Sequence, residues 1–350
     1  PAVVTSTSHG YSNGDEVVIT AVVGMTQVNG KRFLVAGVTT NTFQLTDKDG
    51  TNVNSTGYTA YGSAGTANKV YEIATPYTTA QLFDIKFAQS ADVMYITHPS
   101  HEVEKLSRTA HTTWTLTDVD FTNGPFMDVN TTATTLTPAS AGVGTGVNIT
   151  ASAITGINGG VGWLATDVGR QIYFNSGYAT ITARTSATVA VATITTAFTN
   201  TDATAALQLG SFSDTTGHPS CVTFFEQRLV FAGTTDQPQT IFFSKSGDYE
   251  NMDENIGGTV ADDDAMVYTI ASNQVNAIRF MTATRTLIIG TAGGEFTVSG
   301  GGTDSAVTPT NILIKKQSNH GSANVDALAV GNATLFLQRA KRKIRELAYN

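Results

Sequence analysis

Cysteine, charge and long apolar runs are all scarce in this 350-residue chain. A single cysteine excludes a disulfide scaffold, and no apolar run approaches the roughly 18–20 residues that a membrane-spanning helix needs. Charged residues make up only 14% of the chain, and 28 acids against 20 bases give a net charge of −8. Disorder caused by charge repulsion is therefore excluded. The 33 glycines follow no collagen-like period.

The abundant residues favour β-structure. About one residue in six is threonine, and 41% of the chain is hydrophobic. Threonine, β-branched and aromatic residues suit the pleated, half-buried surface of a sheet, so the composition predicts an all-β protein of two or three domains. A surface with little charge costs less to bury against a neighbour. This mildly favours a subunit of a large assembly, although an ordinary secreted β-protein would have the same composition.

Four segments share one pattern, which consists of an alternating strand, a short turn, a more continuously apolar strand and a third strand. The last three units begin about 50 residues apart, which is the size of a propeller blade. The apolar second strand is typical of one buried on both faces. The pattern predicts propeller-like blades, and the alternative is an antiparallel meander with chance similarity. The first two strands of each unit fall in residues 82–96, 222–232, 275–290 and 325–337.

The repeat is interrupted and preceded by other β-segments. Between the first two units lies a threonine-rich, almost uncharged insertion, whose alternating stretches predict a small β-domain. The predicted fold is thus all-β, with propeller-like blades and two added small β-barrel or sandwich domains. The expected domains are residues 1–70, a small β-domain; 71–126, a blade region; 127–216, the inserted domain; and 217–350, further blades.

No group of residues in the sequence forms a recognisable catalytic, metal or cofactor site. His98 and His101 lie in a loop without nearby cysteine or carboxylate, so a polar loop is favoured over a metal site. The acidic run at residues 262–264 does not have EF-hand spacing, and a solvated loop is the simpler interpretation. Cys221 abuts an apolar strand and is expected to be a buried, inert thiol. The basic run at residues 339–345 could contact nucleic acid, but a charged strand edge is the simpler account.

The first segment resembles a known module. The residues that carry the resemblance are His9-Gly10-Tyr11, Gly14-Asp15, Gly24-Met25-Thr26, Val28-Asn29-Gly30, Phe33 and Asn41 to Leu45. Together they resemble the first catalytic-cysteine half-domain of ubiquitin-activating enzymes, a pattern that is also widespread in bacteriophage tail proteins. Ubiquitin chemistry is not implied, because the only cysteine lies far outside the module. We expect a binding or spacing decoration, with a hairpin turn at Asn29-Gly30.

A second resemblance rests on the region from His218 to Met252. Its motif residues are Phe224, Phe225, Glu226, Arg228, Leu229, Gly233, Ser244, Gly247, Asp248 and Tyr249. This block resembles the tail nozzle (tail tubular protein B) of short-tailed, podovirus-like bacteriophages. Residues 71–125 and the later repeats also fit, so the resemblance covers about half of the chain.

The resemblance implies a non-enzymatic virion protein of the phage tail. Such subunits form a ring, expected to be a hexamer, around the channel for DNA ejection. The expected partners are further copies of the chain, the tail adaptor, the tail fibres and phage DNA in transient passage. Assembly would take place in the host cytoplasm, and the added domains could contact the host surface. The acidic net charge would let DNA slide rather than adhere.

Two further expectations concern the extent of the chain and an alternative function. The chain starts at Pro1 without a visible signal peptide, and the blade repeat ends early, so we expect a portion of a longer polypeptide. The alternative function is an extracellular β-propeller that binds glycans or hydrolyses glycosides. That alternative requires convergent carboxylates or aromatic platforms in one pocket.

Overall fold

The computed structural model describes residues 1–350 except 272–274, 303–304, 332 and 349–350. The chain divides into two compact units, Pro1–Ala74 and Thr75–Asn350. The described residues form antiparallel sheets and three short 3₁₀ helices, with no α-helix among them. The all-β, propeller-like fold predicted from the sequence is confirmed.

The first unit is a five-stranded sheet around a small apolar core that includes Val17, Val35 and Phe43. Asn29 and Gly30 do not form the expected two-residue hairpin turn. They end a longer connection with a 3₁₀ helix, η1 (Thr26–Val28), in which the Asn29 amide donates to Val22 O and accepts from Val22 N. The sheet order is β1 (Val3–Thr5), β4 (Thr42–Thr46), β3 (Lys31–Ala36), β2 (Glu16–Thr20) and β5 (Thr66–Lys69).

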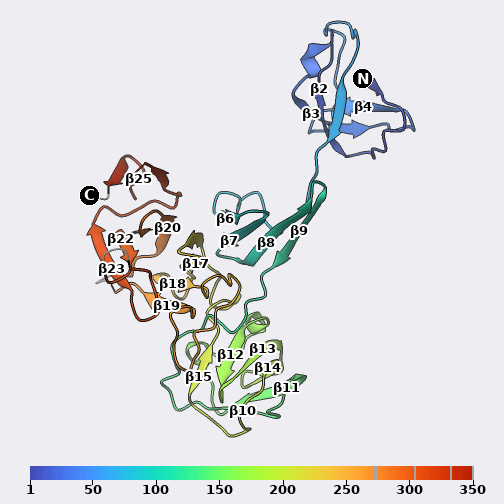
Figure 1. The fold of residues 1–350 in the computed structure, drawn as a ribbon. Helices are drawn as coiled ribbons and strands as arrows, with labels where there is room; N and C mark the ends of the chain where they lie inside the picture. Colours follow the sequence, from blue (N-terminus) through green and yellow to red (C-terminus); the bar gives the residue numbers. More distant parts are fainter. Residues whose placement is uncertain (272–274, 303–304, 332, 349–350) are drawn as a thin grey trace. The chain divides into compact units, whose positions relative to one another are not determined.

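The second unit contains four sheets in which strands pair in chain order, as in propeller blades (Figure 1). Blade 1 comprises β6 (Lys86–Ser90), β7 (Val93–His98), β8 (His101–Ala110) and β9 (Thr113–Asp118). Blade 2 comprises β16 (Cys221–Phe225), β17 (Arg228–Ala232), β18 (Thr240–Phe243) and β19 (Met266–Thr269). Blade 3 comprises β20 (Ile278–Ala283), β21 (Leu287–Thr291), β22 (Gly294–Ser299) and β23 (Leu313–Ser318). Blade 4 comprises β24 (Leu328–Val330), β25 (Ala333–Leu337) and β26 (Ile344–Ala348).

The predicted repeat corresponds to these blades, but the first strands of blades 1, 3 and 4 begin three or four residues later than predicted. The second strands of blades 2 and 3, β17 and β21, are buried along their whole length, as their apolar sequences predict. The first strand of blade 1 begins only at Lys86, because residues 78–84 form turns. The Gln81 side chain accepts from Thr78 N, and Asp84 N donates to Gln81 O. These local bonds compete with strand pairing and leave the apolar Phe83 almost fully exposed.

Lys86 connects all four blades near the starts of their first strands. Its side chain is buried, and its Nζ lies 3.6 Å from Cys221 Sγ on β16 and donates to Arg279 O on β20. The same Nζ lies 3.2 Å from Asp326 Oδ1, just before β24. Apolar clusters seal the contacts from blade 1 to blade 2, from blade 2 to blade 3 and from blade 3 to blade 4.

The inserted domain, residues 127–216, follows blade 1 and contains a six-stranded sheet over an apolar core. Trp163, Ile149 and Phe174 are fully buried in this core. Two 3₁₀ helices, η2 (Asn158–Gly160) and η3 (Ala165–Asp167), lie in its longest connection. The sheet order is β10 (Leu136–Pro138), β11 (Gly144–Ala151), β14 (Val189–Thr196), β13 (Gly177–Arg184), β12 (Gln171–Phe174) and β15 (Leu207–Leu209).

Candidate functional site

The motif residues gather around the β16–β17 hairpin of blade 2. Glu226 and Gln227 form its two-residue turn, and both have a positive φ, 46° and 61°, as a type I′ turn requires. Phe225 and Leu229 point into the apolar core on either side of the sheet. The Glu226 carboxylate accepts a 2.6 Å hydrogen bond from Val307 N, which lies between β22 and β23 of blade 3. This turn therefore joins blade 2 to blade 3.

The Arg228 side chain holds the acidic loop after residue 260 by donating hydrogen bonds to backbone carbonyls of that loop. The guanidinium is buried and donates to the carbonyl oxygens of Ser244 and Asp264 at 2.7 Å and of Asp262 at 2.6 Å. Burial lowers the pKa of Arg228, and the nearby acids oppose this shift. Ser244 Oγ completes the junction, since it accepts from Leu229 N at 2.9 Å.

The acidic run is therefore only partly solvated, in contrast to the sequence-based interpretation. Asp262 and Asp263 are exposed, but Asp264 is buried. Its carboxylate accepts from Ala261 N and lies 2.7 Å from Lys245 Nζ. These bonds and the Lys245 charge lower the pKa of Asp264, although its burial opposes the shift.

Among the remaining motif residues, an aromatic pair joins blade 2 to blade 1. The Phe224 ring packs edge-on against Tyr249 and Tyr95, with centroids 5.0 and 6.1 Å apart. Glu250, next to the motif, accepts from Tyr95 Oη and Lys105 Nζ, both at 2.8 Å. The motif also contains two glycines with positive φ, Gly233 (72°) and Gly247 (76°). The N–H of Gly247 donates to Gln227 O. Asp248 lies in the same turn and accepts from Asn251 Nδ2.

The histidines and the cysteine have structural partners. His98 and His101 flank the β7–β8 turn with ring centroids 5.1 Å apart, and burial lowers the pKa of His98. Cys221 is buried, and burial raises its pKa. Within the described residues, no set of three or more His, Cys, Asp or Glu side chains is arranged to hold a metal ion.

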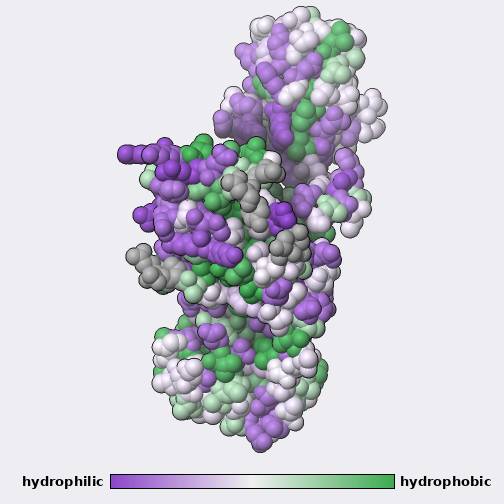
Figure 2. Space-filling model, turned by 60° about the vertical axis from the view of Figure 1, so that its left-hand side comes forward, coloured by the Kyte–Doolittle hydropathy of each residue, from purple (hydrophilic) through white to green (hydrophobic). Residues whose placement is uncertain are grey.

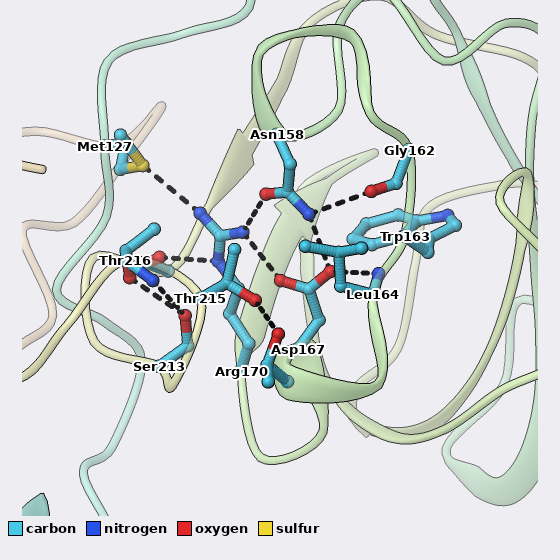
Figure 3. A network of polar contacts seen from close by, with 12 residues as sticks. Met127, Asn158, Gly162, Trp163, Leu164, Asp167, Arg170, Ser213, Thr215 and Thr216 are labelled. Atoms are coloured by element: carbon cyan, nitrogen blue, oxygen red, sulfur yellow. Dashed lines mark hydrogen bonds and ion pairs between the residues drawn. The ribbon is translucent and has the colours of Figure 1, made fainter. Parts of the chain in front are cut away.

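The inserted domain contains a buried polar network that the sequence analysis missed (Figure 3). Arg170 and Asp167 are both fully buried and lie 3.0 Å apart. Arg170 also donates to Gly210 O at 2.8 Å and Asn158 Oδ1 at 2.6 Å. Asp167 accepts from Leu164 N and Asn158 Nδ2, both at 2.7 Å. The network fixes the connection between β11 and β12, and four of its members lie within the 13 residues from 158 to 170.

Outside this network the inserted domain exposes little charge. Its charged residues number six: Asp128, Asp167, Arg170, Arg184, Asp202 and Asp214. In Figure 2 this domain forms the lower lobe, which is mostly white and green, whereas purple side chains are denser over the blades. Where it meets blade 2, Tyr178 Oη donates to Asp253 Oδ1 at 3.1 Å. Burial, together with Asp253 and Asp128, raises the pKa of the neighbouring Glu254 to about 7.

A group of three carboxylates on blade 1 was also missed by the sequence analysis. Glu104 pairs in register with Asp118, and Glu102 precedes it by two residues, so all three carboxylates project from one face. A cavity of about 240 Å³ beside them is lined by Glu102, Asp118, Asp120 and His218. Burial and the neighbouring acids raise the pKa of Glu102 and of Glu104. Alternation along residues 102–106 could have indicated this face, but the Glu104–Asp118 register could not be read from sequence.

Comparison with known proteins identifies one part of the chain. Residues 2–71 match the family described as the ubiquitin-activating enzyme E1 FCCH domain, which confirms the resemblance inferred for the first segment. None of the curated proteins compared with the chain matches it. No helix in the described parts of the chain is long and apolar enough to cross a membrane.

One of the solved structures with similarity to the chain is the phage phi92 endosialidase, at 12% identity and a TM-score of 0.26. The similarity covers 96% of this chain and 52% of that protein, so the chain spans about half of its length.

Proposed function

We propose that this chain is a non-enzymatic structural subunit of a bacteriophage tail nozzle. In this role, copies of the chain form a ring around the channel through which DNA leaves the virion. The ring contacts the tail adaptor on one side and carries the tail fibres. The first unit and the inserted domain decorate the ring and are available for contact with the host surface.

The observation that carries this proposal is the place of the nozzle-like motif in the fold. Several of its residues hold neighbouring blades, or the loops of blade 2, together. Glu226 reaches Val307 of blade 3, Phe224 packs on Tyr95 of blade 1, and Arg228 fixes the loop before β19. A motif used for blade packing fits an architectural protein, whose function lies in its shape and contacts.

The test is assembly of the full chain with its tail adaptor. Electron microscopy and light scattering of the purified proteins should show a ring that binds the adaptor. A chain that remains monomeric at high concentration, and has no affinity for adaptor or fibre, would contradict the proposal.

The glycan-processing alternative has one observation in its favour, the carboxylate-lined cavity of blade 1. A raised pKa of Glu102 is suited to a general acid that works beside a second carboxylate such as that of Asp118. A glycan array and a hydrolase screen test this alternative. Turnover that disappears in Glu102→Gln, with assembly intact, would support it over the structural role.

A further inference from the structure

On the carboxylate face of blade 1, Glu104 has no ion pair with any described residue, and the basic side chain nearest to Glu102 in the adjoining cavity is His218. Glu104 is only 6% exposed, and its side chain makes no hydrogen bond or ion pair with any residue that the structure describes. The Tyr77 hydroxyl near it is also buried without a hydrogen-bond partner. Unpaired buried acids are costly, because burial removes hydration from the charged form and each carboxylate repels the others. A cation bound at this face would relieve that cost.

Apolar surface adjoins the carboxylates. The cross-strand register places Phe87, Ile96, Glu104 and Asp118 in one row across β6, β7, β8 and β9. Phe87 is 61% exposed at one end of this row. We call this surface, with Glu102, the acidic face. Its chemistry suits a partner that presents basic side chains beside an apolar one.

The chain itself presents such a surface on blade 4. The connection between β25 and β26 contains Arg339, Lys341, Arg342 and Lys343, all exposed and without an ion pair among the described residues. Ile344, the first residue of β26, is 73% exposed beside them. We call residues 339–344 the basic hairpin. Four of the 20 basic residues of the chain fall within these six positions.

The free face of blade 4 extends this apolar surface. Ile344 pairs with Leu337, and Leu328 pairs with Leu335, so the four side chains share one face of the sheet. Phe336 projects from the other face, where it packs against Phe280 of blade 3. The face that carries Leu328 and Ile344 therefore points away from blade 3.

We propose that the acidic face of blade 1 binds the basic hairpin of a second copy of this chain. The two surfaces differ, so the contact is head-to-tail, and a head-to-tail contact repeated around an axis closes into a ring. The inference rests on the proposed ring-forming function and assigns the surfaces that would form the ring.

Contacts within the chain leave the hairpin available. Blade 4 meets blade 1 through Asp326 with Lys86 and through Asn324 with Asp84, and neither pair includes a residue of the hairpin. Within its own chain the hairpin touches blade 3 through Arg339 Nη1, which donates to Ala292 O at 3.3 Å. The charges of the hairpin are thus free for a neighbouring copy.

Charge reversal on the full chain tests the proposal. One variant carries Arg342→Glu with Lys343→Glu, and the other carries Glu102→Lys with Asp118→Lys; all four positions are exposed. Each variant alone should self-associate at least about tenfold more weakly than the unchanged chain, because like charges then face each other. An equimolar mixture of the two should associate again through the reversed pair. Mass photometry and light scattering at low and high salt measure both effects, since exposed charge pairs are screened by salt.

A matched control separates this contact from a general effect of charge. Lys315→Glu with Lys316→Glu, on exposed positions of β23, changes the net charge by the same amount and sign as the hairpin variant and should leave association unchanged. Thermal unfolding verifies that every variant is folded. Rings that persist in both reversed variants, or a mixture that stays dissociated, would overturn the proposed surfaces while leaving the nozzle proposal intact. An unchanged chain that never self-associates would contradict both.

Discussion

The buried ion pair of the inserted domain provides the sharpest test of how this protein is stabilised. Asp167 and Arg170 are fully buried, and their side chains form polar contacts with other residues of the protein (Figure 3). Burial lowers the pKa of Arg170, and Asp167 is the main influence that keeps it charged. Replacing one member leaves the other buried without its counter-charge. Such a loss costs about 3–5 kcal/mol, far more than an exposed pair.

The substitution Arg170→Met should therefore lower the stability of the domain by about 3–5 kcal/mol. The methionine chain is similar in length, so the expected loss arises mainly from the unpaired Asp167 and from the hydrogen bonds to Asn158 and Gly210. With a urea m value of about 2 kcal/mol/M, the unfolding midpoint should fall by about 2 M. Arg170→Met combined with Asp167→Asn should cost clearly less than the sum of the single changes, because the buried charge is also removed.

Tryptophan fluorescence gives a local readout of this unfolding. Trp163 is fully buried in the same domain, and the chain has only one other tryptophan, Trp114 on blade 1. In a Trp114→Phe background, the emission reports the inserted domain alone. A midpoint within about 0.3 M of the parent, which corresponds to less than about 1 kcal/mol, would refute a stabilising role for the pair. Strictly additive single and double variants would refute the coupling between the two residues.

Three further results are expected. Arg228→Met should lower the free energy of unfolding by about 3 kcal/mol, because four backbone carbonyls lose a buried donor. Arg228→Lys should not restore that stability, and thermal unfolding measures both variants. Between about pH 4.5 and 7, folded Glu254 retains a proton that the unfolded chain releases, so stability should fall as pH rises, and Glu254→Gln should reduce that slope in urea titrations. Gly233→Ala should cost more than Gly247→Ala in urea unfolding: both have positive φ, but a Cβ at 233 would lie 2.9 Å from Ser220 Oγ, whereas position 247 is open.

Much of the blade pattern could be predicted because it depends on local sequence. Continuous apolar runs identified β17 and β21, since a strand covered on both faces needs no polar alternation. The boundaries were less predictable where side chains bond to nearby backbone. Gln81 holds the turns before Lys86, and Asn29 holds the connection before β3, so neither segment follows its apparent propensity.

The buried charges could not be predicted, because their partners are brought together only by the fold. Arg170 contacts Gly210 and Met127, which are distant in sequence. Asp264 was interpreted as solvated because its two acidic neighbours are exposed, yet Arg228 and Lys245 draw this part of the loop inward. Similarly, Glu104 meets Asp118 only through the register of β8 and β9. Sequence patterns report which face is apolar, but not which polar groups share it.

The few charged residues of this chain can be interpreted more specifically when the residues that contact them are known. A chain with few charged residues could simply have neutral surfaces, but several of its charges are buried at junctions: Lys86 touches all four blades, and Arg228 holds the loop before β19. Such side chains specify how blades meet, because a misplaced blade would leave each of them unpaired. The charges left without partners then stand out against a neutral surface. Among them, the acidic face of blade 1 and the basic hairpin of blade 4 separate charge by sign, as the proposed directional contact between identical copies requires.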